Sequence, residues 1–421
     1  MRRLAAVDAQ TYWLSAKMPS DQVLLYGFAG VPTDLPAAVA DVLARATACN
    51  ELRLRVEDRG GAAYPHWVRC EVDERRVTVH ELAGAGWAEC LAAVTAFSDE
   101  QVDPQVAPWR LEVFPSITGV PGVAGPGTVV ALQISHALAD GLWASTLAAW
   151  LLGRPEPVPA IPAPPRWEAV ALPRRAIAAA RAHRLLTRDV TAGHVAPQAD
   201  TRPVLHTNRR PDGVRLLRTL VRDRAQLGGP TVTVGVLAAI AEALAAHLRD
   251  LGDDPSTLGA EVPMARRGPR AAHNHFGNVG VGLFPDVPVG ERSARIAGEL
   301  AQRRRRADHP ALQAQHRAFA ATPAPLLRWG VAQFDPAVRS PTAIGNTVVS
   351  SVSRGRTDLR FGETPVAVSA GYAELSPMMG LTHGVHGIGS TVAVSVLAAA
   401  SAIGDIDAYT DRLAAALNRS G

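Results

Sequence analysis

The sequence is poor in cysteine, with three residues in a chain of 421. Cys49, Cys70 and Cys90 all lie in the first quarter, and their spacing fits neither a redox pair nor a zinc site. So few thiols exclude a disulfide-rich scaffold and are typical of a reducing compartment. Cysteine usage therefore indicates a cytoplasmic location.

Long apolar runs are also scarce. The first residues lack the apolar stretch that a secretory signal carries after its positive residues. The run from Leu142 to Leu152 is the one that most suggests a membrane helix, and it is too short to cross a bilayer. Any contact with a membrane or lipid surface is therefore expected to be peripheral.

Charge is sparse and mixed in sign, since Asp, Glu, Lys and Arg make up 19% of the chain and sum to +4. This composition excludes a disordered or fibrous protein. Eight tryptophans are present without an alternation of basic and aromatic residues, so nucleic acid is not an expected partner. The tight basic run from Arg303 to Arg306 predicts a solvated helix face, with contact to a phosphate of a cofactor or membrane as the alternative.

The chain is 47% apolar and long enough for two hydrophobic cores, and strand and helix patterns alternate along it. These features predict the α/β class and two domains. Six prolines between residues 155 and 165 disfavour both helix and sheet, because proline removes a backbone donor and holds the chain extended. We therefore predict an N-terminal domain over residues 1–155, a proline-rich linker over 156–172 and a C-terminal domain over 173–421.

One segment in the N-terminal half combines a buried strand, a histidine and a helix start. An apolar strand over residues 128–134 runs into Ser135 and His136, which places the histidine at the carboxyl end of a strand, where α/β proteins bind ligands. Asp140 is a good N-cap for a helix over residues 141–152. Gly141 lacks a side chain, so a substrate or backbone could approach closely. A lone histidine here would more often be structural, and only the whole pattern favours a functional role.

Residues 136–141 resemble the His-x-x-x-Asp-Gly signature of the chloramphenicol acetyltransferase-like superfamily, with His136, Asp140 and Gly141 at its fixed positions. That superfamily includes nonribosomal peptide condensation domains and the wax ester synthase/diacylglycerol acyltransferase family. Further segments resemble the latter family in its own order: residues 8–14, 107–111, 262–267, 276–279, 283–285 and 372–377. The likeness therefore spans nearly the whole chain.

The resemblance implies two related α/β domains of two-layer topology, with a tunnel at their interface that the catalytic loop faces. It implies that His136 is the general base and that Asp140, with Gly141, structures the loop without taking part in the chemistry. Arg267 is most similar to the family's Arg partner of this Asp, and the adjacent Arg266 is its rival.

Three departures from the family pattern affect the substrate more than the fold. Ser135 replaces the first of two histidines, Val234 and Gly235 stand where the family has an Asn-Asp pair, and residues 350–355 only partly represent a late Asn-x-Pro-Gly-Pro block. The expected substrate contacts are Ser135, Gly277, Asn278 and Ser351.

The activity that the resemblance implies is transfer of an acyl group from acyl-CoA or an acyl carrier protein thioester to a hydroxyl or amine acceptor. An imidazole of ordinary pKa is suited to general base catalysis at physiological pH, worth about 10²- to 10⁴-fold. His136 would take the acceptor's proton and return it to the leaving thiolate, and helix-start amides near Gly141 would bind the oxyanion. Neither a tightly bound cofactor nor a covalent acyl-enzyme is implied.

Alternatives remain open at this point. A chain that kept the fold but lost turnover would act as a partner in a biosynthetic complex, and the three departures motivate this reading. A condensation-like enzyme would depend on a carrier protein as donor. Two histidine pairs have spacings that can bring imidazoles together, but no cysteine or acidic cluster completes a site, so no metal is expected. These pairs are His273 with His275 and His383 with His386.

Overall fold

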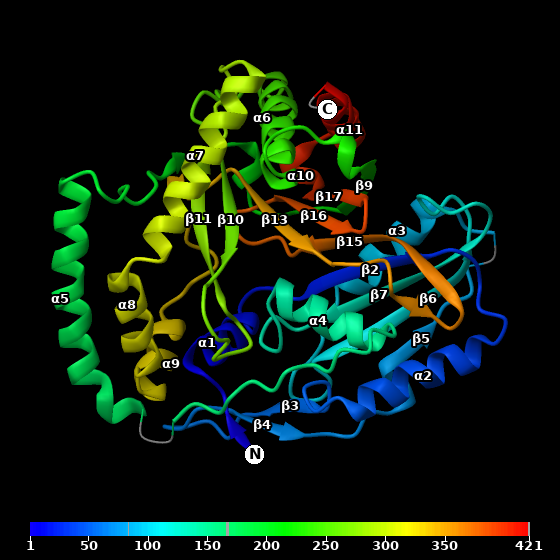
Figure 1. Cartoon of the computed structure of the whole chain (residues 1–421), viewed down its shortest axis with the longest axis horizontal. Coiled ribbons are helices and arrows are strands. Elements are labelled where there is room, and N and C mark those ends of the chain that lie inside the picture. The colour runs from blue at the N-terminus through cyan, green and yellow to red at the C-terminus, as the bar shows by residue number, and fades with distance from the viewer. Residues whose placement is uncertain (83, 166–167, 420–421) are drawn as a thin grey trace.

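All eight residues of strand β7 (Gly127–Ile134) are buried, as expected of a strand covered on both faces. Val130 and Leu132 belong to one core cluster, whereas Val129 and Ala131 belong to another. Successive side chains of a strand point to opposite faces, so the sheet that contains β7 is packed on both sides. The computed structural model describes residues 1–82, 84–165 and 168–419 (Figure 1).

Strand β7 lies inside the first of two six-stranded sheets. This sheet runs in the order β14 (Arg360–Phe361), β15 (Thr364–Ala373), β2 (Gln22–Phe28), β7, β6 (Trp109–Ile117) and β5 (Val77–Val79). Its neighbours are antiparallel except β5 and β6, which are parallel. The long strands β6 and β7 pair directly, so β7 ends beside the start of β6.

The second six-stranded sheet is built from the C-terminal part. It runs in the order β11 (Phe276–Gly282), β10 (Gly259–Ala265), β13 (Thr347–Ser353), β16 (Leu381–Ile388), β17 (Thr391–Ala399) and β9 (Arg215–Asp223). Strand β13 is parallel to both of its neighbours, and the other pairs are antiparallel. The β10–β11 hairpin forms one edge of this sheet and extends toward α1 in Figure 1.

Strands β14 and β15 come from the C-terminal part of the chain but complete the N-terminal sheet, where β15 pairs antiparallel with β2. Strand β15 also lies against β16 and β17 of the second sheet. The segment predicted as the C-terminal domain, residues 173–421, therefore contributes strands to both large sheets. Without β15, this edge of β2 would have no hydrogen-bonding partner. Pairing with β15 supplies one, because a buried strand edge needs a partner for its backbone groups.

Helices cover the sheets in three groups (Figure 1). With the first sheet go α1 (Ala6–Ser15), α2 (Leu35–Ala48), α3 (Trp87–Ser98) and α4 (Gly141–Leu151). With the second go α6 (Val232–Asp250), α7 (Val289–Ala307), α10 (Ala400–Ile403) and α11 (Ile406–Arg419). At one side of the molecule stand α5 (Leu172–Thr191), α8 (Pro310–Ala320) and α9 (Ala324–Ala332), with α5 against α8 and α9 against α1.

The remaining strands of the described chain form two small sheets. They are β1 (Arg2–Arg3), β4 (His66–Arg69) and β3 (Leu54–Glu57) in one sheet, and β12 (Thr342–Ala343) with β8 (Arg202–Pro203) in another.

Helix α6 has the length and apolar composition of a membrane span, and it is the one helix of the described chain that does. Of its most apolar window, 72% is buried inside the molecule. Its Leu237, Ile240 and Leu244 are fully buried in the second core cluster. Helix α6 therefore lies in the core of the C-terminal part of the molecule.

The α/β class is confirmed. The proline-rich stretch carries neither helix nor strand over residues 154–165, and a short 3-10 helix, Glu168–Ala171, follows within the predicted linker. Residues 166 and 167 of the predicted linker lie outside the described residues, and α5 begins at Leu172. Strands β13 and β16 and helices α8 and α9 were not predicted. In β16, His383, Gly384, His386 and Gly387 interrupt the β-branched pattern that would have indicated a strand.

Candidate active site

His136 lies just beyond the end of β7, in the loop that leads into α4. Its ring stacks on Phe276 of β11 with 5.4 Å between the ring centroids, so the two sheets meet at this side chain. The Nδ1 atom of His136 is buried and has no hydrogen-bond partner in the described chain. Stacking, and not a hydrogen bond at Nδ1, thus holds the ring.

The ring borders a cavity of about 620 Å³, which we call the catalytic chamber. Both halves of the chain line it: Gln22, Asp140 and Gly141 come from the N-terminal half, and Phe276 and Ser351 from the C-terminal half. The implied cavity at the interface is therefore present. His136 therefore lines a cavity to which both halves of the chain contribute.

Asp140 is the anchor of the loop. One carboxylate oxygen accepts from the backbone N–H of Trp143 at 2.9 Å, which caps α4 as predicted. The guanidinium of Arg270 donates to both carboxylate oxygens, at 2.8 and 3.0 Å. The backbone N–H of His275 donates to the same group at 2.8 Å. Such bidentate, charge-assisted contacts are strong and directional, so the loop is held in one position.

The connection between β10 and β11 supplies these contacts and extends into the N-terminal half. Asn274 donates its amide N–H to the carbonyl oxygen of His136 at 2.8 Å and a second to Asp8 at 3.1 Å. The backbone N–H of Asp140 donates to the carbonyl of His273 at 3.3 Å. The hairpin therefore fixes the backbone at both His136 and Asp140.

His273 anchors the hairpin in turn. It is 1% exposed and lies between the carboxylates of Asp8, at 3.3 Å, and Glu51, at 2.9 Å. Burial lowers the pKa of His273, but the two carboxylates outweigh it and the net shift is upward. Burial likewise raises the pKa of Glu51, and hydrogen bonds and charges from His273 and Arg2 reverse the shift to a net lowering. His273, Asp8, Glu51 and Arg2 thus form a network of ion pairs with His273 buried at its centre.

Two predicted site residues are corrected by the structure. Arg267 does not pair with Asp140: its side chain is 74% exposed and forms an ion pair with Asp308 at 3.1 Å. The rival Arg266 forms no ion pair with Asp140 either, and the partner is Arg270. Ser135 is 1% exposed and does not line the chamber; its hydroxyl accepts from the backbone N–H of Ala137. It shapes the turn instead of contacting a substrate.

The other predicted substrate contacts divide between two cavities. Ser351 lines the catalytic chamber and shares a hydrogen bond of 2.8 Å with Thr233. Asn278 lines the chamber and also a neighbouring cavity, whereas Gly277 lines only the neighbouring one. An added Cβ at Gly141 would lie 3.5 Å from Gln22 and Val352, which is ordinary contact, so the protein itself leaves room for a methyl group there.

The departure at Gly235 has a packing explanation. A Cβ added there would lie 1.9 Å from the carbonyl oxygen of Gly228, so no side chain fits. The start of α6 therefore packs backbone to backbone with the preceding loop, at the place where the family carries two polar side chains.

Sequence reasoning missed Arg270, Asn274 and Phe276 as site residues. Arg270 lies three positions beyond the predicted partner, and no local pattern distinguishes these arginines. Asp8 belonged to a segment that resembled the family, but nothing in the sequence pointed to its contacts with His273 and Asn274.

Two of the four histidines considered for a metal, His273 and His383, have other side-chain partners. His383 is buried between Thr347 and Tyr409, at 2.8 and 2.7 Å, and burial lowers its pKa to about 3. His386 is also buried, and its pKa is lowered by burial and by Arg354. Across the described residues, no group of three or more His, Cys, Asp or Glu side chains is placed to hold a metal ion.

Comparison with known proteins gives matches only at the level of structure. No protein-family model matches the chain, and no curated protein does. The wax ester synthase/diacylglycerol acyltransferase from Marinobacter aquaeolei VT8 superimposes with a TM-score of 0.64 at 19% identity, covering 99% of this chain and 98% of that one.

Variants of the starter condensation domain of rhizomide synthetase RzmA match similarly. One in complex with C8-CoA and Leu-SNAC has a TM-score of 0.60 at 14% identity, covering 99% of this chain and 92% of that one. Another in complex with C8-CoA has a TM-score of 0.60 at 16% identity, with 99% and 94% covered. The chain thus shares the two-lobed fold of these proteins, which is the fold that the signature at His136 implied.

Proposed function

We propose that the protein transfers an acyl group from a thioester such as acyl-CoA to a hydroxyl or amine acceptor, with His136 as the general base. One observation carries the proposal: the imidazole stands at the end of a buried strand, on the wall of a chamber that both halves of the chain line. A walled-in ring would have excluded it.

The proposed reaction balances without a cofactor. His136 takes the proton of the acceptor as its oxygen or nitrogen attacks the thioester carbonyl, which forms a tetrahedral oxyanion. The carbon–sulfur bond then breaks, and the imidazolium returns its proton to the thiolate. Because one residue both accepts and donates this proton, a single imidazole suffices.

The start of α4 supports the development of negative charge beside His136. The cap formed by Asp140 uses the N–H of Trp143. The two preceding amides of α4, at Gly141 and Leu142, border the chamber, and we assign them to the oxyanion.

The structural comparison supports a thioester as the acyl donor. The solved structures that share the fold include a wax ester synthase/diacylglycerol acyltransferase and condensation domains in complex with C8-CoA, which supports a thioester donor. A carrier-protein thioester has the same reacting group. An experiment must therefore decide whether the donor is acyl-CoA or a carrier-protein thioester, because the geometry of His136 fits both.

The test measures thiol release with acyl-CoA and with carrier-loaded acyl groups, against alcohol and amine acceptors. His136→Ala is expected to lower the rate by about 10²- to 10⁴-fold with unchanged thermal unfolding. The matched control is His194→Ala, because that side chain is 74% exposed and remote from the chamber lining. Equal rates in both variants would overturn the role of His136, and no thiol release from any pair would favour the scaffold reading.

A further inference from the structure

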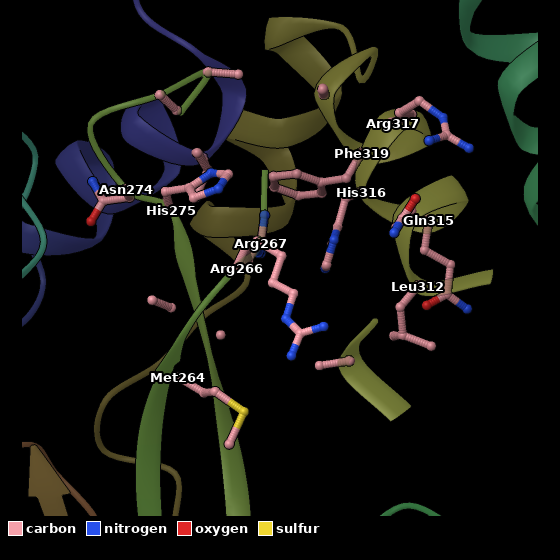
Figure 2. A pocket seen from close by; sticks show the side chains of 18 of the residues that line it. Met264, Arg266, Arg267, Asn274, His275, Leu312, Gln315, His316, Arg317 and Phe319 are labelled. Atoms are coloured by element: carbon pink, nitrogen blue, oxygen red, sulfur yellow. The ribbon is translucent and has the colours of Figure 1, made fainter. Parts of the chain in front are cut away.

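A second cavity of about 950 Å³ lies across the β10–β11 hairpin from His136. We call it the basic chamber. Helices α5, α7 and α8 form its other walls, and Figure 2 shows Arg266 and His316 directed into the space between the hairpin and α8. The two chambers share Met264, Ala265, Asn278 and Arg304, so the hairpin and α7 form the partition.

The lining of the basic chamber is strongly unbalanced in charge. Ten of its residues are Arg or His, and two, Glu168 and Asp308, are acidic. Glu168 already pairs with Arg3 and Arg175, and Asp308 pairs with Arg267. The remaining basic groups therefore face the cavity with no unshared carboxylate among the described lining residues.

The basic run of α7 belongs to this wall and is not the solvated face that the sequence predicted. Arg303, Arg304 and Arg306 are half-buried and donate to the backbone carbonyls of Gly280, Ala265 and Ala196, whereas Arg305 is exposed. A carbonyl satisfies a donor but does not cancel the charge. Arg303 also pairs with Glu299 at 4.0 Å, so the charges of Arg304 and Arg306 remain without a carboxylate partner in the described chain.

Arg266, His275 and His316 form the centre of the basic chamber. Nε of Arg266 and Nε2 of His275 are buried and have no hydrogen-bond partner in the described chain. Burial, with the charges of Arg266 and His275, lowers the pKa of His316 to about 4. Burial and the charges of Arg270 and Arg266 also lower the pKa of His275. At neutral pH these two imidazoles are therefore uncharged and each can donate one N–H, while Arg266 supplies a positive charge, which is a donor set suited to an anion.

We propose that the basic chamber binds a phosphate-bearing ligand, with Arg266, His275 and His316 as donors to the phosphate oxygens. Guanidinium groups match phosphate geometry with two parallel hydrogen bonds, and several cations suit a group with more than one charge. Leu186, Leu312 and Phe319 offer apolar contact for the rest of the molecule. The site is distinct from His136, and the inference does not depend on acyl transfer.

The shared chemistry is the phosphate group, which three kinds of probe supply. Calorimetry would measure binding of inorganic pyrophosphate, of coenzyme A, and of phosphatidylcholine vesicles with and without phosphatidic acid. Binding of coenzyme A would identify the ligand as a nucleotide that carries its phosphates. Binding of the vesicles with phosphatidic acid would identify a lipid headgroup. Binding of pyrophosphate alone would identify a free phosphate. Each of these outcomes supports the site, provided that it depends on Arg266.

Arg266→Gln is expected to lower the affinity for the probe that binds by at least 10-fold. Arg305→Gln is the matched control, because it removes an exposed charge from α7 outside the chamber lining and should change the affinity less than 2-fold. His316→Gln provides a second variant if Arg266→Gln does not fold. Absence of binding by every probe, or equal weakening by Arg266→Gln and Arg305→Gln, would overturn the proposal. His136→Ala should bind the probe normally, which separates this test from that of acyl transfer.

Discussion

The two chambers on either side of the β10–β11 hairpin share a wall but differ in chemistry. The catalytic chamber presents one histidine with an unpartnered Nδ1, together with acidic groups at Asp140, Glu261 and Glu374. The basic chamber presents ten Arg or His residues and two paired acids. Consecutive residues of the hairpin serve opposite sides, since Phe276 stacks on His136 and His275 lines the basic chamber. One strand can therefore serve two sites that mutations should separate.

The largest expected effect comes from removing the carboxylate that joins the loop to the hairpin. Asp140→Ala leaves Arg270 without its ion-pair partner and should lower the unfolding free energy by about 3–5 kcal/mol, with about 1 kcal/mol more from the lost cap. Asp140→Asn keeps a cap acceptor and should lose less. Denaturant unfolding measures both, and a loss below about 1 kcal/mol for Asp140→Ala would show that the hairpin does not hold the loop.

A slightly smaller effect is expected from His273→Gln, about 3 kcal/mol, and it should depend on pH. The pKa of His273 is raised from 6.5, so its contribution is complete below that value and is lost as pH rises through the raised pKa. The pKa of Glu51 is lowered from 4.5, so its contribution is complete above that value and is lost as pH falls through the lowered pKa.

Thermal unfolding from pH 4 to 9 would therefore show the largest difference between His273→Gln and the unchanged protein between about pH 4.5 and 6.5. The difference should shrink at higher pH as the imidazole loses its proton. A difference that stays constant across the range would mean that packing, and not charge, accounts for the effect.

Substitutions at Phe276 and His275, neighbours in the hairpin, would test whether the two chambers act separately. Phe276→Leu removes a ring contact worth about 0.5–1.5 kcal/mol, so acyl transfer should fall by about 2- to 12-fold while probe affinity changes less. His275→Gln should lower the affinity for the phosphate-bearing probe more than it lowers acyl transfer, because the backbone N–H that binds Asp140 is retained. Parallel losses in both assays for both variants would show that the chambers are one site.

The smallest effect is expected at Arg267, the partner that sequence reasoning assigned to Asp140. Its ion pair with Asp308 is largely exposed, so Arg267→Ala should cost less than about 1 kcal/mol in denaturant unfolding. Arg270→Ala should cost several times more, because it leaves a buried carboxylate with reduced compensation. Similar losses for the two variants would contradict the pairing.

Much of the fold and the centre of the site could be predicted because their signals are local. The eight-residue buried strand, the histidine after it and the capping Asp140 lie within fifteen consecutive positions, and their spacing determines a strand, a turn and a helix start. The order of family-like segments then indicated the fold. By contrast, the exchange of β15 into the first sheet depends on strand pairing between distant segments, which no local pattern encodes.

The sequence by itself determined that a histidine would stand at a strand end before a capped helix, because backbone propensities and capping act over a few neighbouring residues. Only the tertiary structure decided which arginine reaches Asp140, since the path of the β10–β11 connection sets that distance and three candidates lie within five positions. Tertiary structure also turned the arginine run of α7 inward. Charge patterns read along a helix cannot reveal which face a hairpin will cover, because that depends on how the helix packs against β10, β11 and residues 196–197.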